Sequence, residues 1–314
     1  MMQNYNKKLQ FQTGTALVTA LLIVALASVI ATAMLKQQHI DIRRANNMVK
    51  GDQAVLYLRV GENWVRKLLA EDSISSKIDS LTEDWAKENN KLDVDGGTIQ
   101  FDVEDLQGRL NLNNLLDQEG RPSKPDLGQF RNLLVALELD PELTQPIVDW
   151  IDTDINVSLP TGAEDQEYLA LDQPYRTANA PFVSSSELML IKGFSREIFD
   201  KLAPYITALP KRVEVNVNTA SIPVFAAVIG VDLVEAESIY SARPEKGYQD
   251  ITEFRGQQAL TGKTVVGVNV KSEFFMARVI VGLGRYNVSQ HSVIARDNKE
   301  ASPPVIIQRS RAKI

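Results

Sequence analysis

The most pronounced feature of the hydrophobic pattern is an uncharged apolar run at residues 15–35, TALVTALLIVALASVIATAML. Folded as an α-helix, a run of this length is about 30 Å long, which matches the hydrocarbon core of a bilayer. The residues before it include Lys7 and Lys8 but no acidic residue, which favours a cytoplasmic N-terminus. The pattern therefore predicts one transmembrane helix, with the rest of the chain on the opposite side of the membrane.

Three kinds of N-terminal signal compete to explain this run. A cleaved secretory signal has an apolar region of about 7–15 residues, so this run is too long for it. A class III, prepilin-type leader is short and basic, ends in Gly and is cut before an apolar helix that is retained. Gly14 followed by Thr15 fits this pattern, so we predict cleavage between these two residues. A plain signal anchor remains the alternative.

Helical periodicity continues beyond the membrane segment. Apolar residues recur at near-helical spacing at Val55, Leu58, Val65, Leu68 and Leu69. No proline occurs between residues 36 and 69. We therefore predict one long helix over 15–70, with an amphipathic second half that packs on a soluble domain. A short helix is expected near 79–90.

The pattern then changes to alternation of apolar and polar residues. The segment 96–113, which opens with two glycines, predicts a strand or hairpin. Segments 270–286, 288–297 and 304–312 predict three antiparallel strands. Between these regions the chain has a mostly helical pattern.

The predicted fold class is α+β. A long N-terminal transmembrane pilin-like helix packs on a small antiparallel sheet formed by residues 71–110 and 269–314. A large, mostly helical domain, residues 111–268, is inserted between the strands. The short leader that precedes the helix is residues 1–14.

Two similar motifs occur inside the predicted helical domain. Asn111 and Asn113 alternate with leucines, and Asn216 and Asn218 alternate with valines. Each pair precedes an apolar helical pattern, and Asn side chains are suited to capping free backbone amides. Simple capping and a duplicated structural unit both remain open.

A helix-hairpin-helix outline occurs at residues 184–210, with a turn at Gly193. In DNA-binding versions of this motif, the amides of the turn and nearby basic residues hold a phosphate. Few cations flank this turn, and the chain carries 34 Lys plus Arg against 40 Asp plus Glu, a net charge of −6. We therefore favour a packing role for this motif over binding of nucleic acid.

The composition also limits the possible chemistry. The chain has 314 residues and no cysteine, which excludes thiol catalysis, Cys-ligated zinc and disulfides. His39 and His291 are the only histidines, and neither lies in a catalytic motif. The stretch 256–264 imitates a phosphate loop but has one residue too many between its glycines. We expect no enzymatic activity.

The segment 149–172, DWIDTDINVSLPTGAEDQEYLALD, contains no Lys or Arg. Its seven acidic residues are Asp149, Asp152, Asp154, Glu164, Asp165, Glu167 and Asp172. Carboxylates at this density repel one another, and a bound cation would remove that cost. A solvated acidic loop without an ion remains the alternative.

The spacing of Asp152, Asp154 and Asn156 puts side-chain oxygens at alternate positions, as in calcium-binding loops. The segment is not an EF-hand, because its sixth and twelfth positions lack the Gly and Glu of that motif. Ligands that are all oxygen favour Ca²⁺ over Zn²⁺. We predict a calcium site formed by Asp152, Asp154, Glu164 and Asp165, with Asp149 and Asn156 as weaker candidates.

Several motifs together resemble one known family, the minor pseudopilin K family of type II secretion systems. The motifs are the leader ending at Gly14, RLNLN at 109–113, DWIDTD at 149–154, GAEDQEYL at 162–169, PYRTANAPF at 174–182, SELMLIKGF at 186–194 and VNVNTA at 215–220. The resemblance covers nearly the whole chain. One difference is that some relatives carry a disulfide, whereas this chain has no cysteine.

The resemblance implies a structural assembly protein of the inner membrane rather than an enzyme. Its precursor is cut by prepilin peptidase, the new N-terminus is methylated, and its C-terminal domain lies in the periplasm. The resemblance also implies a place at the tip of the pseudopilus with minor pseudopilins I and J, and calcium in the acidic loop. The alternative is a membrane-anchored helix-hairpin-helix DNA-binding protein of the competence type.

The fifth residue after the predicted cut, Thr19, bears on this position at the tip. Pilin-like subunits usually carry Glu there, and its carboxylate can pair with the terminal amine of the preceding subunit. A buried carboxylate without a partner is costly. Because a first subunit has no neighbour ahead of it, an uncharged residue suits the tip.

Overall fold

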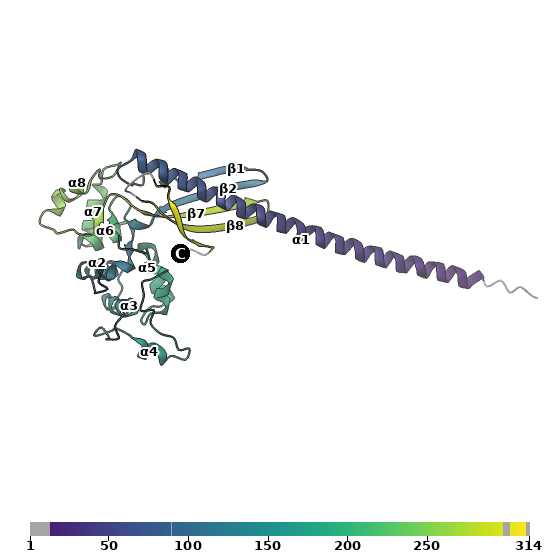
Figure 1. Ribbon diagram of the computed structural model, residues 1–314, viewed down its shortest axis with the longest axis horizontal. Helices are drawn as coiled ribbons and strands as arrows, with labels where there is room; N and C mark the ends of the chain where they lie inside the picture. Colours follow the sequence, from purple (N-terminus) through teal and green to yellow (C-terminus); the bar gives the residue numbers. More distant parts are fainter. Residues whose placement is uncertain (1–12, 89, 298–301, 312–314) are drawn as a thin grey trace, which may run out of the picture. The chain divides into compact units, whose positions relative to one another are not determined.

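The structure, a computed structural model, describes residues 13–88, 90–297 and 302–311 (Figure 1). The chain divides into two compact units, Met1–Leu56 and Tyr57–Ile314. The predicted leader lies outside the described residues except for Thr13 and Gly14, which begin the first helix.

Helix α1 (Thr13–Ser75) is continuous and ends five residues beyond the predicted 15–70. The predicted membrane segment lies within it, and its most apolar window has a mean hydropathy of 2.5 with no residue buried. By length and composition this helix can cross a membrane. At its C-terminal end the hydroxyl of Ser75 bonds to the carbonyl of Glu71, so this polar residue is accommodated within the last turn.

The second unit contains a five-stranded antiparallel sheet in the order β1-β2-β7-β8-β9. Its strands are β1 (Asn90–Val94), β2 (Gly97–Asp105), β7 (Phe274–Leu283), β8 (Tyr286–Ala295) and β9 (Val305–Ser310). The part of α1 from Tyr57 onward packs on one face of this sheet and buries Leu58, Val65 and Leu69. Gly61 permits the close approach, because a Cβ there would lie 2.5 Å from Val279. The α+β class and the three C-terminal strands are confirmed.

The predicted helix near 79–90 is wrong. Only a short 3₁₀ turn, η1 (Asp84–Ala86), forms there. The carboxylate of Glu83 accepts hydrogen bonds from the Ser80 amide and from the Trp85 indole, both at 2.9 Å, which fixes a turn instead of a helix. The Trp85 ring is buried edge-on against Phe275, with ring centroids 5.2 Å apart. Strand β1, which follows, was not predicted.

Helices are the main regular secondary structure of the inserted region between β2 and β7. Its helices are α2 (Lys124–Ala136), α3 (Thr144–Ile151), α4 (Asp165–Leu169), α5 (Arg196–Leu202), α6 (Ile222–Ile229), α7 (Leu233–Ser241) and α8 (Ile251–Arg255). They enclose an apolar core of their own, which includes Phe130, Leu133, Trp150, Phe225 and Phe254. The helix-hairpin-helix outline is incomplete, because its first arm is the 3₁₀ segment η5 (Ser185–Leu190).

Two short parallel strand pairs divide the inserted region into similar halves. Strand β3 (Leu110–Asn111) pairs with β4 (Ile206–Thr207), and β5 (Val215–Asn216) pairs with β6 (Val268–Asn269). Each half thus opens with one of the Asn motifs and closes with a parallel strand about 50 to 100 residues later.

The asparagines perform the same tasks in both halves. Asn111 accepts a hydrogen bond from the Asn113 amide, and Asn216 accepts one from the Asn218 amide. The second Asn of each pair then brackets a returning backbone residue, with Asn113 bonded to the N–H and C=O of Phe182 and Asn218 to those of Tyr248. Local capping alone does not explain these distant bonds, so the repeated geometry favours a duplicated unit.

Candidate metal centre

Three of the predicted ligand residues meet between helices α3 and α4. Asp152 follows the last residue of α3, and Glu164 precedes the first residue of α4. One carboxylate oxygen from each of Asp152, Asp154 and Glu164 lies within 4.8 Å of the other two. Asp152 is only 6% exposed and Glu164 only 4% exposed. The fold thus gathers three carboxylates, two of them buried and Asp154 exposed.

Several oxygens of these carboxylates lack a protein hydrogen-bond donor. Among the residues that the structure describes, Asp152 Oδ1 and both carboxylate oxygens of Glu164 are buried without a hydrogen-bond donor. Burial of an unpaired charge is strongly unfavourable, and a coordinated cation is one way to compensate it. Because all the candidate ligand atoms are carboxylate oxygens, the site fits a hard cation such as Ca²⁺.

The pKa values of the same groups reflect this environment. Burial, together with the charges of Asp149 and Asp152, raises the pKa of Glu164 to about 7. Burial also raises the pKa of Asp152 to about 6, with additional repulsion from Asp154 and Asp149. A divalent cation would act in the opposite direction, because it favours the ionised carboxylates.

Asp149 lies beside the three carboxylates and holds the loop that joins them. It is fully buried in α3, and its two carboxylate oxygens accept the Ser158 amide at 3.2 and 3.1 Å. The chain passes close to this carboxylate at Gly162, where a Cβ would lie 2.2 Å from Asp149 Oδ2. Only glycine fits at this position.

The two remaining predicted ligands have other contacts. Asn156 donates its backbone amide and its side-chain amide to Asp154 Oδ1, at 2.7 and 2.8 Å. Asp165 is turned towards the segment after α4, where it accepts the amide and hydroxyl of Thr177 and pairs with Arg176. These bonds, first of all that from the Thr177 hydroxyl, lower the pKa of Asp165. Asp165 therefore lies outside the group of three carboxylates.

Three aromatic residues, from α3, from α4 and from the segment after α4, pack against one another. Trp150 of α3 contacts Tyr168 of α4 and Tyr175, with ring centroids 5.5 and 6.3 Å apart, and the two tyrosines stack at 5.3 Å. Burial raises the pKa of Tyr168 to about 12. The acidic spacing gave no signal for these aromatic contacts. They bring together side chains from three of the separate motifs noted in the sequence.

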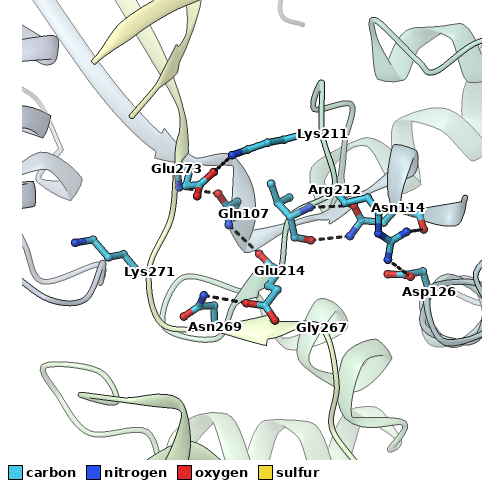
Figure 2. Close-up of a pocket in the computed structure, with 11 residues that line it drawn as sticks. Gln107, Asn114, Asp126, Lys211, Arg212, Glu214, Gly267, Asn269, Lys271 and Glu273 are labelled. Atoms are coloured by element: carbon cyan, nitrogen blue, oxygen red, sulfur yellow. Dashed lines mark hydrogen bonds and ion pairs between the residues drawn. The ribbon is translucent and has the colours of Figure 1, made fainter. Parts of the chain in front are cut away.

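Two other polar features contain cations that are already paired with carboxylates. The hollow in Figure 2, about 340 Å³ in volume, lies where the inserted region meets β7. Two of the three cations in its lining, Arg212 and Lys211, pair with Asp126 and Glu273. At the helix-hairpin-helix turn, Lys192 pairs with Glu167 at 3.0 Å, which favours the packing role over phosphate binding.

Comparison with known proteins gives a consistent result. Family models described as type II secretion system (T2SS), protein K match residues 108–211 and 215–271, which correspond closely to the two halves of the inserted region. The chain is 36% identical to type II secretion system protein K of Pseudomonas aeruginosa, over 87% of this chain and 85% of that protein. It is 33% identical to that of Aeromonas hydrophila, over 92% of this chain and 95% of that protein.

A solved structure shares the fold. It is a chain of the GspK–GspI–GspJ complex from the type 2 secretion system of enterotoxigenic Escherichia coli. The TM-score is 0.77 at 23% sequence identity, and the match covers 86% of this chain and all of the other.

Proposed function

Since the chain belongs to the protein K family of type II secretion systems and is a minor pseudopilin, we propose that it stands at the tip of the pseudopilus. There it helps to initiate assembly and the export of folded proteins from the periplasm. The observation that carries this proposal is the construction of α1. One continuous helix has a fully exposed apolar segment near its start and, from Tyr57 onward, a face buried against a sheet.

This construction suits a subunit that is anchored in the inner membrane by a single pass. The cytoplasmic side is the N-terminal one, and the sheet and inserted domain lie in the periplasm. Prepilin peptidase would cut after Gly14, and the new N-terminal Thr15 would be methylated. The intact mass of the membrane-extracted protein should then lack residues 1–14, whereas a mature chain beginning beyond Ile30 would contradict the proposal.

Thr19 supports the place at the tip. Its hydroxyl donates to the carbonyls of Thr15 and Ala16 at 3.1 and 3.0 Å, so this polar group is satisfied inside its own helix. It needs no partner from a preceding subunit. A Thr19→Glu variant would place a carboxylate in lipid or among apolar helices at a cost of a few kcal/mol, and we expect it to assemble poorly.

The proposed partners are the minor pseudopilins I and J, by analogy with the GspK–GspI–GspJ complex that contains the similar chain. Val60 and Trp64, one helical turn apart on α1, are 43% and 49% exposed on the side away from the sheet. Exposed large apolar residues, Trp above all, are frequent in protein interfaces. These two residues are therefore candidates for contact with a partner helix.

Co-expression and co-purification of the full chain with I and J test this function. The wild type should recover both partners, and Trp64→Glu should lose most of at least one of them. Val135→Glu changes an exposed apolar residue on α2 instead and should behave as the wild type. Failure of the wild-type chain to recover either partner would contradict the proposal.

The proposed role of Ca²⁺ is structural. Asp152, Asp154 and Glu164 would bind the ion, with Asp149 beside them, and the ion would hold the end of α3 close to the start of α4. Support comes from the buried oxygens without donors. Mg²⁺ should substitute poorly, because it requires a tighter octahedral shell and retains its waters.

A further inference from the structure

A groove of about 610 Å³ lies next to the candidate metal centre. One wall includes Val157, in the loop that joins the predicted ligands, and the opposite wall is α4 with the residues that follow it. The lining is Val157, Gly162, Ala163, Glu164, Gln166, Glu167, Ala170 and Leu171. The lining thus combines apolar side chains, among them Val157 and Leu171, with the carboxylates of Glu164 and Glu167.

Large aliphatic side chains around this groove remain in solvent. Ile155 and Leu159, which flank Val157 in the same loop, are 79% and 83% exposed. Leu171, which lines the groove, and its near neighbour in the chain Leu169 are also exposed. Single exposed aliphatic residues are common, but five of them between residues 155 and 171, two in the lining of one groove, are typical of a binding surface.

The negative charge around the groove limits which kinds of partner can bind there. No Lys or Arg occurs between residues 149 and 172, which carry seven acidic residues. Arg176 pairs with Asp165 and Lys192 with Glu167, and a bound divalent ion would offset two further charges. The segment stays acidic even then. A second copy of this chain and an anionic membrane surface would both be repelled.

We propose that this groove docks a segment of a partner protein that presents large apolar side chains flanked by Lys or Arg. The apolar side chains would fill the space between Val157 and Leu171. The basic residues would meet acidic side chains beside the groove, including Asp172. Complementary charge of this kind raises the rate of association and excludes acidic competitors.

The metal ion would control the shape of this groove. The wall around Val157 lies between Asp154 on one side and Glu164 on the other, and Asp149 holds Ser158 within it. Without an ion, the three clustered carboxylates repel one another and the wall is released. Docking should therefore require calcium, and this dependence rests on the calcium site proposed above.

Surface plasmon resonance with the full chain in zwitterionic lipid nanodiscs tests the proposal, with empty discs in the reference channel. The probe is an octapeptide of alternating Lys and Leu with blocked ends. Matched peptides alternate Glu with Leu, or Lys with Ser. In calcium, the Lys–Leu peptide should bind at least tenfold more tightly than either matched peptide. Equal binding of the Lys–Ser peptide would overturn the proposal, because charge alone would explain it.

Variants locate the binding. Val157→Thr combined with Leu171→Gln should weaken the Lys–Leu peptide at least tenfold and leave the calcium-dependent thermal shift unchanged. Val135→Thr combined with Leu233→Gln alters exposed apolar residues elsewhere and should change neither property. Unchanged peptide binding by the groove variant would overturn the proposal. So would self-association of the discs that the groove variant abolishes, because the occupant would then be a second copy.

The design separates this inference from the proposed function. EGTA should abolish binding of the Lys–Leu peptide, and Asp154→Asn should do the same in calcium. A protein that shows the calcium shift and recovers I and J, yet does not bind the peptide, would refute the docking groove alone. Groove-dependent peptide binding that persists in EGTA would refute the role of the ion in docking.

Discussion

Two groups of three carboxylates occur in this chain, and the protein neutralises them differently. Asp72, Asp79 and Glu83 have carboxylate oxygens within 4.8 Å of one another, as do Asp152, Asp154 and Glu164. In the first group a cation is built into the fold. The guanidinium of Arg296, fully buried, bonds to Asp79 at 2.6 Å and to Asp72 at 2.9 Å, and also lies over the Phe275 ring.

The second group has no such side chain. Within the described part of the chain, no Lys or Arg pairs with Asp152, Asp154 or Glu164, and three of their oxygens are buried without a donor. In the first group the fold supplies a buried positive charge, Arg296, whereas in the second no Lys or Arg of the described residues does so. From this difference we predict that the second group responds to calcium and that the first does not.

The largest expected effect comes from removing the built-in cation. Arg296→Met should lower the free energy of unfolding by about 3–5 kcal/mol, because Asp79 would remain buried without its partner. Chemical denaturation followed by circular dichroism measures the loss. Arg278→Met, which changes an exposed arginine of β7, is the matched control and should cost under about 0.5 kcal/mol. If Arg296→Met and Arg278→Met were equally stable, Arg296 would not stabilise the first group of carboxylates.

Removal of the external cation should have the next largest effect. A ligand that binds only the folded chain adds about 2.7 kcal/mol at a hundredfold excess over its Kd. Thermal melts of the full chain in detergent should therefore differ by several degrees between calcium and EGTA, with magnesium close to EGTA. Identical melts, together with no calcium in elemental analysis, would leave the second group as a set of buried acids without an ion.

The sequence was informative about the second group and silent about the first for a physical reason. Asp152, Asp154 and Glu164 lie on one short acidic segment, so their density is visible without a structure. Arg296 is more than 200 residues from Asp72 in the chain, and only the pairing of β7 with β8 brings it near. Local charge patterns cannot reveal a contact that depends on sheet topology.

The same limit applies to the fold and to single ligands. The apolar run and the alternation in β7 and β8 predicted a helix and strands, because burial imposes those periods on the sequence. Strand β1, NKLDV, was missed because most of its residues are polar and it lies at the edge of the sheet. Spacing also could not show that Asp165 turns towards Thr177, since adjacent residues can point in different directions.

Two single substitutions in the acidic segment should distinguish a residue that binds the ion from one that only stabilises the loop. Asp154→Asn should abolish the calcium-dependent shift, yet in EGTA it should melt at or slightly above the wild type, because one of three repelling charges is gone. Asp165→Asn should keep the shift and lower the melting temperature both in calcium and in EGTA, because it weakens the bonds to Thr177 and Arg176. If Asp165→Asn lost the calcium-dependent shift, Asp165 would be a ligand of the ion.

The smallest effect expected is in the pH dependence of the calcium shift, and it distinguishes the two groups once more. In the absence of an ion, burial raises the pKa of Asp152 from 3.8 to about 6 and that of Glu164 from 4.5 to about 7. Raised values mean that the protonated forms favour folding, and this stability is lost as the pH rises through 6 and 7. Calcium favours the ionised forms and should prevent that loss.

The difference between melts in calcium and in EGTA should therefore grow from pH 5 to pH 7.5. Asp72, whose pKa burial raises to about 7 in the other group, titrates in the same window. Its contribution is equal with and without calcium, because Arg296 is its partner in both conditions, so it cancels in the difference. A calcium shift that stays constant across this range would mean that Asp152 and Glu164 do not change protonation when the ion binds.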